Sequence, residues 1–168
     1  ALAFALKGTN ELTDDYIAQI SKRIANARPT AVNLQWAVDE VLTAIKNNSN
    51  NSYNDSSSLF EVALSTAEKI RSDDIANCSK IGDFGLKIIK DIYDSLPQKR
   101  PINILTHCNA GWLATIDWGT AIAPIYKAQE FLIPIHVWVD ETRPRNQGAS
   151  LTAFELKQQE IPHTIIPD

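Results

Sequence analysis

The stretch "INILTHCNAGWLAT", residues 102–115, decides the fold because its pattern changes within a few positions. Its first part, residues 102–107, is short and rich in branched apolar residues, which predicts a β-strand. The residues from Gly111 to 131 have the length of a helix, and Pro124 predicts a kink or break within it. Cys108 therefore lies between the end of a strand and the expected start of a helix.

The same order of elements continues toward the C-terminus. Residues 133–141 predict a second strand, residues 150–161 an amphipathic helix and residues 162–168 the start of a third strand. Alternating strands and helices predict parallel strands with right-handed crossovers, as in a Rossmann-like sheet. Ligands of such sheets bind beyond the carboxyl ends of the strands. The loops 106–112 and 140–150, and the residues after Asp168, are therefore the expected place for a site.

The sequence before this region predicts helices. Apolar residues recur at helical spacing in four segments, residues 12–27, 30–46, 59–71 and 81–93. We therefore predict an α/β protein with two domains. The first is a helical N-terminal domain, residues 1–97, with a polar Asn/Ser-rich loop at 47–58. The second, residues 101–168, is the first half of a Rossmann-like domain, and the breaker-rich linker 95–101 joins the two.

Composition excludes several classes of protein. The 168 residues are 44% hydrophobic and 21% charged, with a net charge of −4. This charge gives no basic field for nucleic acid, and no apolar run is long enough to span a membrane. The sequence has no G-x-G-x-x-G after the first strand and no P-loop motif, so it lacks the usual signals of nucleotide binding. We expect neither a nucleic-acid nor a membrane partner, and no cofactor.

The chain has two cysteines, Cys78 and Cys108. A single disulfide is possible, but nothing else in the sequence is typical of a secreted protein. We interpret both residues as thiols in a reducing compartment, the cytoplasm. Because the sequence has neither a C-x-x-C pair nor a histidine cluster, we expect no metal site.

Cys108 allows two interpretations. Backbone N–H groups at a following helix start would form an anion site and favour the thiolate, whereas the neighbouring Trp112 and Leu113 would favour the neutral thiol. A thiol between these influences can exchange a proton with a substrate. The alternative is a small buried residue in a structural turn. His107 should point to the opposite side of the strand and is interpreted as structural.

Two further stretches contain candidate anion ligands. "DETRPRNQGASLT", residues 140–152, holds two arginines, whose guanidinium groups fit phosphate oxygens, and Gln147, which can bind a hydroxyl or a phosphate. Its alternative interpretation is a solvated, capped loop. In "ARPTAVNL", residues 27–34, Arg28 precedes a helix start and could face an anion, or could be an ordinary surface arginine.

Together, "RPTAVNL", "THCNAGWLAT…WGTA" and "VWVDETRPRNQGASLTAFEL" resemble the motifs of the methylthioribose-1-phosphate isomerases. The resemblance covers nearly all of the chain from Ala27 onward. The wider group contains ribose-1,5-bisphosphate isomerase and the regulatory subunits of initiation exchange factor 2B. The resemblance implies a helical domain followed by a Rossmann-like domain, usually dimeric, which agrees with the interpretation of the residues.

The resemblance also implies an activity. The family converts an aldose 1-phosphate, 5-methylthioribose 1-phosphate, into the ketose 1-phosphate in methionine salvage, a route of amino-acid biosynthesis, without nicotinamide or metal. Cys108 corresponds to the catalytic cysteine, and Arg28 and Gln147 to residues that hold the substrate or its phosphate. Arg143 lies in the adjoining string. Asn109 and Gly111, beside the thiol, are further candidate substrate-binding residues.

The sequence departs from the family pattern at its two ends. The family's "RGAPAIG" segment would precede Ala1, and its catalytic aspartate would lie beyond Asp168. We therefore expect the sheet to be truncated at both ends and this chain alone to be inactive. We expect a homodimer whose missing C-terminal segment is either disordered or supplied by another chain.

Two alternatives remain for the function. One is a non-catalytic regulatory subunit related to exchange factor 2B, in which the "THCN" string should be degraded; here it is intact. The other is an isomerase of another ribose phosphate, because Trp112 and Trp118 are variants of the motif. The sequence leaves open the substituent at C5 of the substrate, and whether a proton or a hydride moves.

Overall fold

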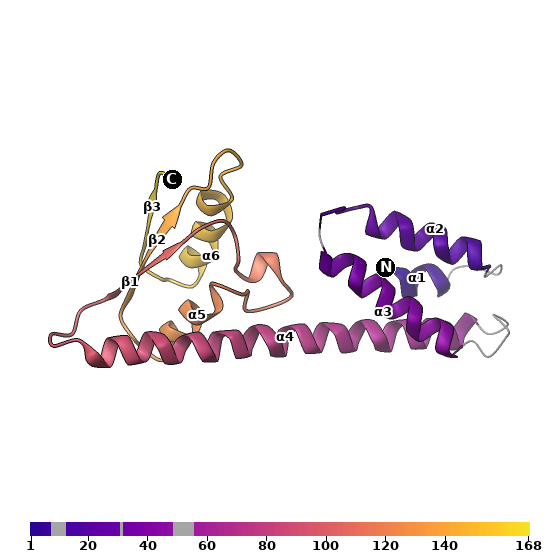
Figure 1. Ribbon diagram of the computed structural model, residues 1–168, viewed down its shortest axis with the longest axis horizontal. Coiled ribbons are helices and arrows are strands. Elements are labelled where there is room, and N and C mark those ends of the chain that lie inside the picture. Colours follow the sequence, from indigo (N-terminus) through magenta and orange to yellow (C-terminus); the bar gives the residue numbers. More distant parts are fainter. Residues whose placement is uncertain (8–12, 31, 49–55) are drawn as a thin grey trace. The chain divides into compact units, whose positions relative to one another are not determined.

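The computed structural model describes residues 1–7, 13–30, 32–48 and 56–168, and it divides into two compact units, residues 1–72 and 73–168. The elements, labelled in Figure 1, are α1 (Leu2–Lys7), α2 (Asp14–Ala25), α3 (Val32–Asn48), α4 (Ser56–Ser95), β1 (Ile102–Thr106), η1 (Trp112–Ala114), α5 (Ala123–Glu130), β2 (Ile135–Asp140), η2 (Gly148–Thr152), α6 (Ala153–Gln158) and β3 (His163–Ile166). The predicted boundary between residues 97 and 101 stays a prediction, since α4 has residues in both units.

The first unit is helical, as predicted. Helix α2 begins after Thr13, whose hydroxyl accepts the N–H of Tyr16 at 3.2 Å, and Asp14 and Asp15 occupy its first turn. The apolar faces of the helices enclose one core, made of Leu2, Ala3, Leu6, Ile17, Val41, Ile45, Leu59 and Ala63. The predicted loop 47–58 falls largely on residues outside those that the structure describes.

Helix α4 corrects one prediction. The sequence pattern predicted separate helices at 59–71 and 81–93, but α4 is a single helix of 40 residues. The intervening residues 72–80 contain neither glycine nor proline, so nothing in the backbone ends the helix there. The helix ends at Ser95, two residues before Pro97, in agreement with the predicted linker.

The second unit contains the predicted parallel sheet. Its three strands lie in the order β1-β2-β3, and both neighbouring pairs are parallel. Ile104 is paired with Val137, which is also paired with His163. Every strand therefore ends at the same edge of the sheet, the edge to which β1 brings residue 108 and β2 brings the loop after residue 140.

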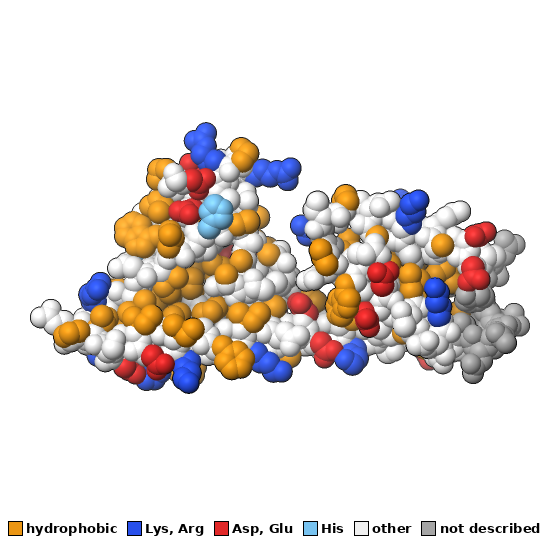
Figure 2. Space-filling model, in the orientation of Figure 1, with side chains coloured by type: hydrophobic (Ala, Val, Ile, Leu, Met, Phe, Trp, Pro, Cys, Tyr) orange, Lys and Arg blue, Asp and Glu red, His pale blue; other side chains and the backbone are white. Residues whose placement is uncertain are grey.

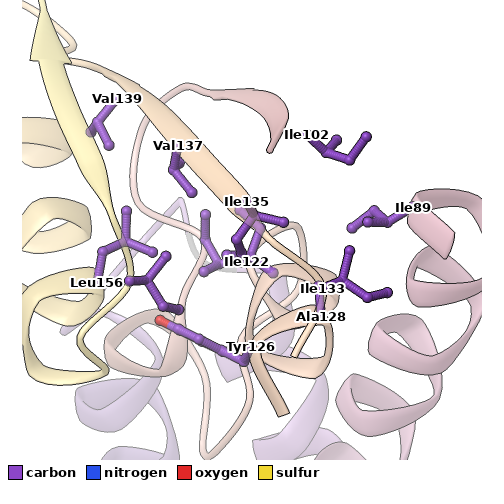
Figure 3. Packing of buried hydrophobic residues seen from close by; sticks show 12 residues of the cluster. Ile89, Ile102, Ile122, Tyr126, Ala128, Ile133, Ile135, Val137, Val139 and Leu156 are labelled. Carbon is purple, nitrogen blue, oxygen red and sulfur yellow. The ribbon is translucent and has the colours of Figure 1, made fainter. Parts of the chain in front are cut away.

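One hydrophobic core joins the helices of this unit to the sheet (Figure 3). Figure 3 shows Ile89 of α4 and Leu156 of α6 on opposite sides of Ile122 and Ile135. At Gly85, α4 approaches α5 so closely that an added Cβ would lie 2.6 Å from the Cβ of Pro124. The buried members of this core are Ile89, Ile102, Ile122, Ile125, Tyr126, Ala128, Ile133, Ile135, Val137, Val139, Leu156 and Ile161.

The helix predicted from Gly111 to 131 is wrong in its first half. Residues 112–114 form a single 3-10 turn, and the helix α5 begins only at Ala123. Trp118 and Gly119 have φ values of 66° and 76°, a left-handed conformation that interrupts a right-handed helix. Pro124 lies in the first turn of α5, where its missing N–H is tolerated, so it starts a helix rather than kinking one.

The predicted helix at 150–161 is confirmed as the π-helical turn η2 followed by α6. Among the residues that the structure describes, no helix combines the length and the apolar character that a membrane span requires.

Candidate functional site

The candidate site lies at the carboxyl edge of the sheet. Cys108 follows β1, and Thr142 and Gln147 belong to the segment that follows β2. Because β1 and β2 are adjacent and parallel, these segments meet although they are distant in the sequence. Figure 2 shows basic, acidic and histidine side chains gathered at this end of the sheet-bearing unit.

The backbone of Cys108 is held from both sides. Its N–H donates to the Oγ1 of Thr142 at 2.8 Å, and its carbonyl accepts from the Oγ1 of Thr152 at 2.7 Å. Its φ is 67°, a conformation that a residue with a side chain rarely adopts. Such a conformation persists only where the surroundings impose it, and it is often found at functional sites.

The thiol of Cys108 contacts the predicted substrate ligand Gln147. The Nε2 of Gln147 donates to the Sγ of Cys108 at 3.3 Å, and the thiol is half-buried. The Oε1 of Gln147 is buried and has no hydrogen-bond partner among the described residues. The amide therefore has one group on the sulfur and one buried acceptor without a partner in the described part of the chain.

Asn109 and Gly111 follow Cys108 in the same loop, and both contact the buried residue Glu155. The Nδ2 of Asn109 donates to the Oε1 of Glu155 at 3.1 Å. Gly111 packs so closely against the Glu155 carboxylate and the Tyr126 hydroxyl that a Cβ would overlap the carboxylate. Both residues are therefore part of the wall behind the thiol.

The helix start expected after Cys108 is a single 3-10 turn, and two of its N–H groups are already occupied. The N–H of Leu113 donates to the Oε1 of Glu155 at 2.9 Å. The N–H of Ala114 donates to the carbonyl of Gly111 at 3.0 Å. The N–H groups of Leu113 and Ala114, which the sequence pattern predicted to bind an anionic ligand, therefore bind other groups of the protein.

Arg143 reaches the same edge with its side chain in solvent. Its Nη1 lies 3.7 Å from the Oε1 of Glu141, and its side chain is 73% exposed. The N–H groups of Arg143 and Thr142 donate to the Asp168 carboxylate at 2.6 and 2.8 Å. These bonds, with that from Arg143 the strongest cause, hold the pKa of Asp168 below its ordinary value.

Arg28 belongs to the other unit. It is exposed and lines a hollow of about 460 Å³ together with Pro29, Trp36 and Asp39. Its role at a site shared with Cys108 stays a prediction.

One group of side chains has the donor atoms of a metal site. His107, Asp140 and Asp168 follow or end the three strands, and one potential ligand atom of each lies within 4.8 Å of the others. The Nδ1 of His107 is 3.2 Å from the Oδ2 of Asp140, and both Asp168 oxygens accept backbone N–H groups. A metal ion bound through the Nδ1 of His107 would replace the contact of that nitrogen with Asp140, whereas the carboxylate oxygens keep further lone pairs beside the N–H groups they accept.

The aromatic side chains after the thiol surround a separate cavity. Trp112 lines a cavity of about 270 Å³ with Trp118, Tyr126 and Ile161, and Cys108 is not among the lining residues. Trp112 also packs against Phe154, with ring centroids 6.4 Å apart.

Three residues that hydrogen-bond the backbone of Cys108 or the loop after it were not predicted from the sequence: Thr142, Thr152 and Glu155. Thr152 and Glu155 are fully buried. Their sequence signal is their spacing, because residues three apart share one face of a helix, and Leu156 on that side is also buried. Two polar residues on the apolar face of a predicted helix indicate a buried hydrogen-bond network.

The chain is similar to a known protein family along almost its whole length. The family model described as the initiation factor 2 subunit family matches residues 3–168. The chain is 50% identical to a methylthioribose-1-phosphate isomerase of Methylocella silvestris and 47% identical to one of Escherichia coli, in both cases over 100% of this chain. It spans less than half of these curated relatives, 44% and 43% of their lengths.

Solved structures show the same fold. The 5-methylthioribose 1-phosphate isomerase of Pyrococcus horikoshii matches 99% of this chain with a TM-score of 0.79 and 29% identity, over 44% of its own length. Subunit delta of the translation initiation factor eIF-2B from A. fulgidus matches 99% of this chain with a TM-score of 0.75 and 33% identity, over 46% of its own length.

Proposed function

This chain belongs to the initiation factor 2 subunit family, and from that membership we propose that the protein carrying it is a sugar-phosphate isomerase. Its reaction converts 5-methylthioribose 1-phosphate into 5-methylthioribulose 1-phosphate, within methionine salvage. The observation that carries the proposal is the contact between the thiol of Cys108 and the amide of Gln147 at the carboxyl edge of the sheet. The relatives that bear the isomerase name support it.

The chemistry explains why a thiol suits this site. Phosphate blocks C1 of the substrate, so the ring must open by breaking the bond between C1 and the ring oxygen. The ring oxygen gains a proton, the C2 hydroxyl loses one and one hydrogen moves from C2 to C1, so that product and substrate are isomers. A residue that exchanges protons is needed beside C1 and C2, and Cys108 takes this role.

The neighbouring residues bind and orient the sugar. The Nε2 of Gln147 stabilises negative charge on the sulfur, and its unpartnered Oε1 accepts a hydrogen bond from a substrate hydroxyl. Arg143 and Arg28 supply positive charge for the phosphate. Asn109 and Gly111 shape the wall against which the sugar lies.

A second candidate is a non-catalytic regulatory subunit. The fold similarity to subunit delta of eIF-2B from A. fulgidus favours it. The surroundings of Cys108 favour the enzyme over the regulatory subunit. A subunit that only binds proteins has no chemical need for a cysteine in a strained conformation beside a glutamine amide.

Phosphorus NMR of sugar phosphates incubated with the complete gene product tests the proposal. We expect 5-methylthioribose 1-phosphate to be converted into the ketose 1-phosphate faster than ribose 1-phosphate or ribose 1,5-bisphosphate. Conversion of none of the three would favour the regulatory subunit. Preferred conversion of ribose 1,5-bisphosphate would favour the other isomerase.

We also propose that the complete protein is a homodimer in the cytoplasm. Light scattering during size-exclusion chromatography tests the dimer, and cell fractionation tests the location.

A further inference from the structure

One face of the η2–α6 segment carries two polar residues without exposure to solvent. Thr152 and Glu155 are both 0% exposed and lie three residues apart. This spacing places both side chains on the same side of a helix. That side faces the loop of residues 108–113, which contains the thiol of the proposed isomerase site.

The carboxylate of Glu155 binds this loop from inside. Its Oε1 accepts from the Nδ2 of Asn109 at 3.1 Å and from the N–H of Leu113 at 2.9 Å. Its Oε2 accepts from the hydroxyl of Tyr126 at 2.7 Å. The absence of a side chain at Gly111 leaves room for the carboxylate. The carboxylate therefore sets the path of the loop on the side away from the substrate.

The hydroxyl of Thr152 acts on the cysteine itself. It donates to the carbonyl of Cys108 at 2.7 Å and accepts from the Nδ2 of Asn109 at 3.4 Å. The φ of Cys108, 67°, has a cost that must be offset by such contacts. If the carbonyl is released, the residue can relax toward negative φ, and its Sγ turns away from Gln147.

We propose that Thr152 and Glu155 are positioning residues, which hold Cys108 in its left-handed conformation so that the sulfur stays on the Gln147 amide. The inference rests on the proposed isomerase function for its catalytic consequence. Thr152 hydrogen-bonds the carbonyl of Cys108, and Glu155 hydrogen-bonds Asn109 and Leu113, so both act through the loop and not on the sulfur itself.

The decisive pair of variants is Thr152→Val and Thr152→Ser in the complete gene product. Valine keeps the shape and removes the hydroxyl, and serine keeps the hydroxyl. We expect Thr152→Val to lower kcat by about tenfold to a hundredfold with KM changed less than about threefold, as for a misplaced catalytic group. We expect Thr152→Ser to recover kcat to within about threefold of the parent.

A second readout does not depend on isomerase activity. The rate at which iodoacetamide alkylates Cys108, followed on the peptide that contains it, is measured between pH 6 and pH 10. Turning the sulfur away from the Gln147 amide removes a donor to the thiolate, so Thr152→Val should move the midpoint of this profile to higher pH. Thr152→Ser should leave the midpoint where the parent has it.

Glu155→Gln and Leu156→Ala complete the set. Glutamine can keep an oxygen on Asn109 and Leu113 and donate to Tyr126, so its kcat should lie between those of the parent and of Thr152→Val. Leu156→Ala removes a buried side chain of the core, next to Glu155 in sequence. It should lower Tm without moving the alkylation profile of Cys108.

The inference would be overturned if folded Thr152→Val had the same alkylation profile and the same kcat as the parent. It would also be overturned if Thr152→Ser failed to recover the profile and the kcat of the parent. An equal shift in Leu156→Ala would also overturn it, because the effect would then come from stability alone. If the complete protein converts no sugar phosphate, the proposed function fails, and the alkylation profiles still decide the positioning role.

Discussion

The side-chain amide of Gln147 donates a hydrogen bond of 3.3 Å to the Sγ of Cys108, a residue 39 positions earlier in the chain. The parallel pairing of β1 with β2 brings the two segments to one edge of the sheet. A hydrogen bond to an ionised sulfur is stronger than one to a neutral thiol, so the amide can stabilise negative charge that develops on the sulfur during a reaction. This contact leads to a prediction for each partner.

Replacing Gln147 should impair catalysis more than folding. Gln147→Leu removes the donor to the sulfur and the free acceptor Oε1, and loss of a hydrogen bond to a charged group costs about 1.5–3 kcal/mol. We expect kcat/KM to fall by about tenfold to a hundredfold. Steady-state assays of the complete gene product measure this. Gln158→Leu, the same change at an exposed position of α6, should stay near the parent, and an equal loss there would contradict the role of Gln147.

Gly111 should tolerate no side chain as long as residue 155 is the native glutamate. Gly111→Ala places a Cβ on the Glu155 carboxylate, and overpacking of this kind costs about 1–3 kcal/mol of unfolding free energy. Denaturant unfolding measures the loss. In a double-mutant cycle, Glu155→Asp shortens the carboxylate side chain, so the two changes together should cost less than their sum. Strict additivity would show that the two residues do not compete for this space.

Cys78 should be an unreactive thiol. It is 3% exposed, and burial, followed by the charge of Asp74, raises its pKa. In the native Cys108→Ala variant, alkylation of the Cys78 peptide should stay slow through neutral pH and become fast only at strongly basic pH or on unfolding. Native alkylation as fast as that of an unfolded control peptide at neutral pH would contradict the burial of this side chain.

Protonation of Asp168 at acid pH should weaken its hydrogen bonds to the loop after β2. Its pKa is lowered chiefly by the N–H of Arg143, so the folded state favours the ionised carboxylate. The stabilisation is complete above the ordinary pKa of the side chain and is lost as pH falls through the lowered value. The amide NMR signals of Thr142 and Arg143 should titrate with that low midpoint, and Asp168→Asn should abolish the titration. A midpoint at or above the ordinary value would contradict these hydrogen bonds.

Local sequence patterns predicted much of this fold. Branched apolar runs between breakers identified all three strands, and their alternation with helices identified the parallel sheet. The patterns failed at residues 111–122 and in the middle of α4. Residues 111–122 contain apolar residues in a helix-like arrangement, but Trp118 and Gly119 adopt left-handed conformations that interrupt a right-handed helix. The continuity of α4 was missed because the mostly polar segment 72–80 weakens its apolar stripe.

The candidate site could be predicted only in part, for a physical reason. Residue type and strand order were enough to bring Cys108 and Gln147 to one edge. The conformation of Cys108 and the burial of Glu155 arise from bonds between segments that are distant in sequence. A carboxylate on a helix is usually solvated. The spacing of Thr152 and Glu155 indicates a buried network, but it does not identify the three groups that donate to the Glu155 carboxylate.

Substitution of the two cysteines in the complete gene product shows whether the thiol of Cys108 takes part in the reaction. We expect Cys108→Ser to lower the rate of conversion of 5-methylthioribose 1-phosphate by about a hundredfold or more, the size of a general acid–base contribution. We expect Cys78→Ser to retain most of the rate. A Cys108→Ser enzyme as active as the parent would show that the thiol has no part in the reaction, and the proposed role of Cys108 would be wrong.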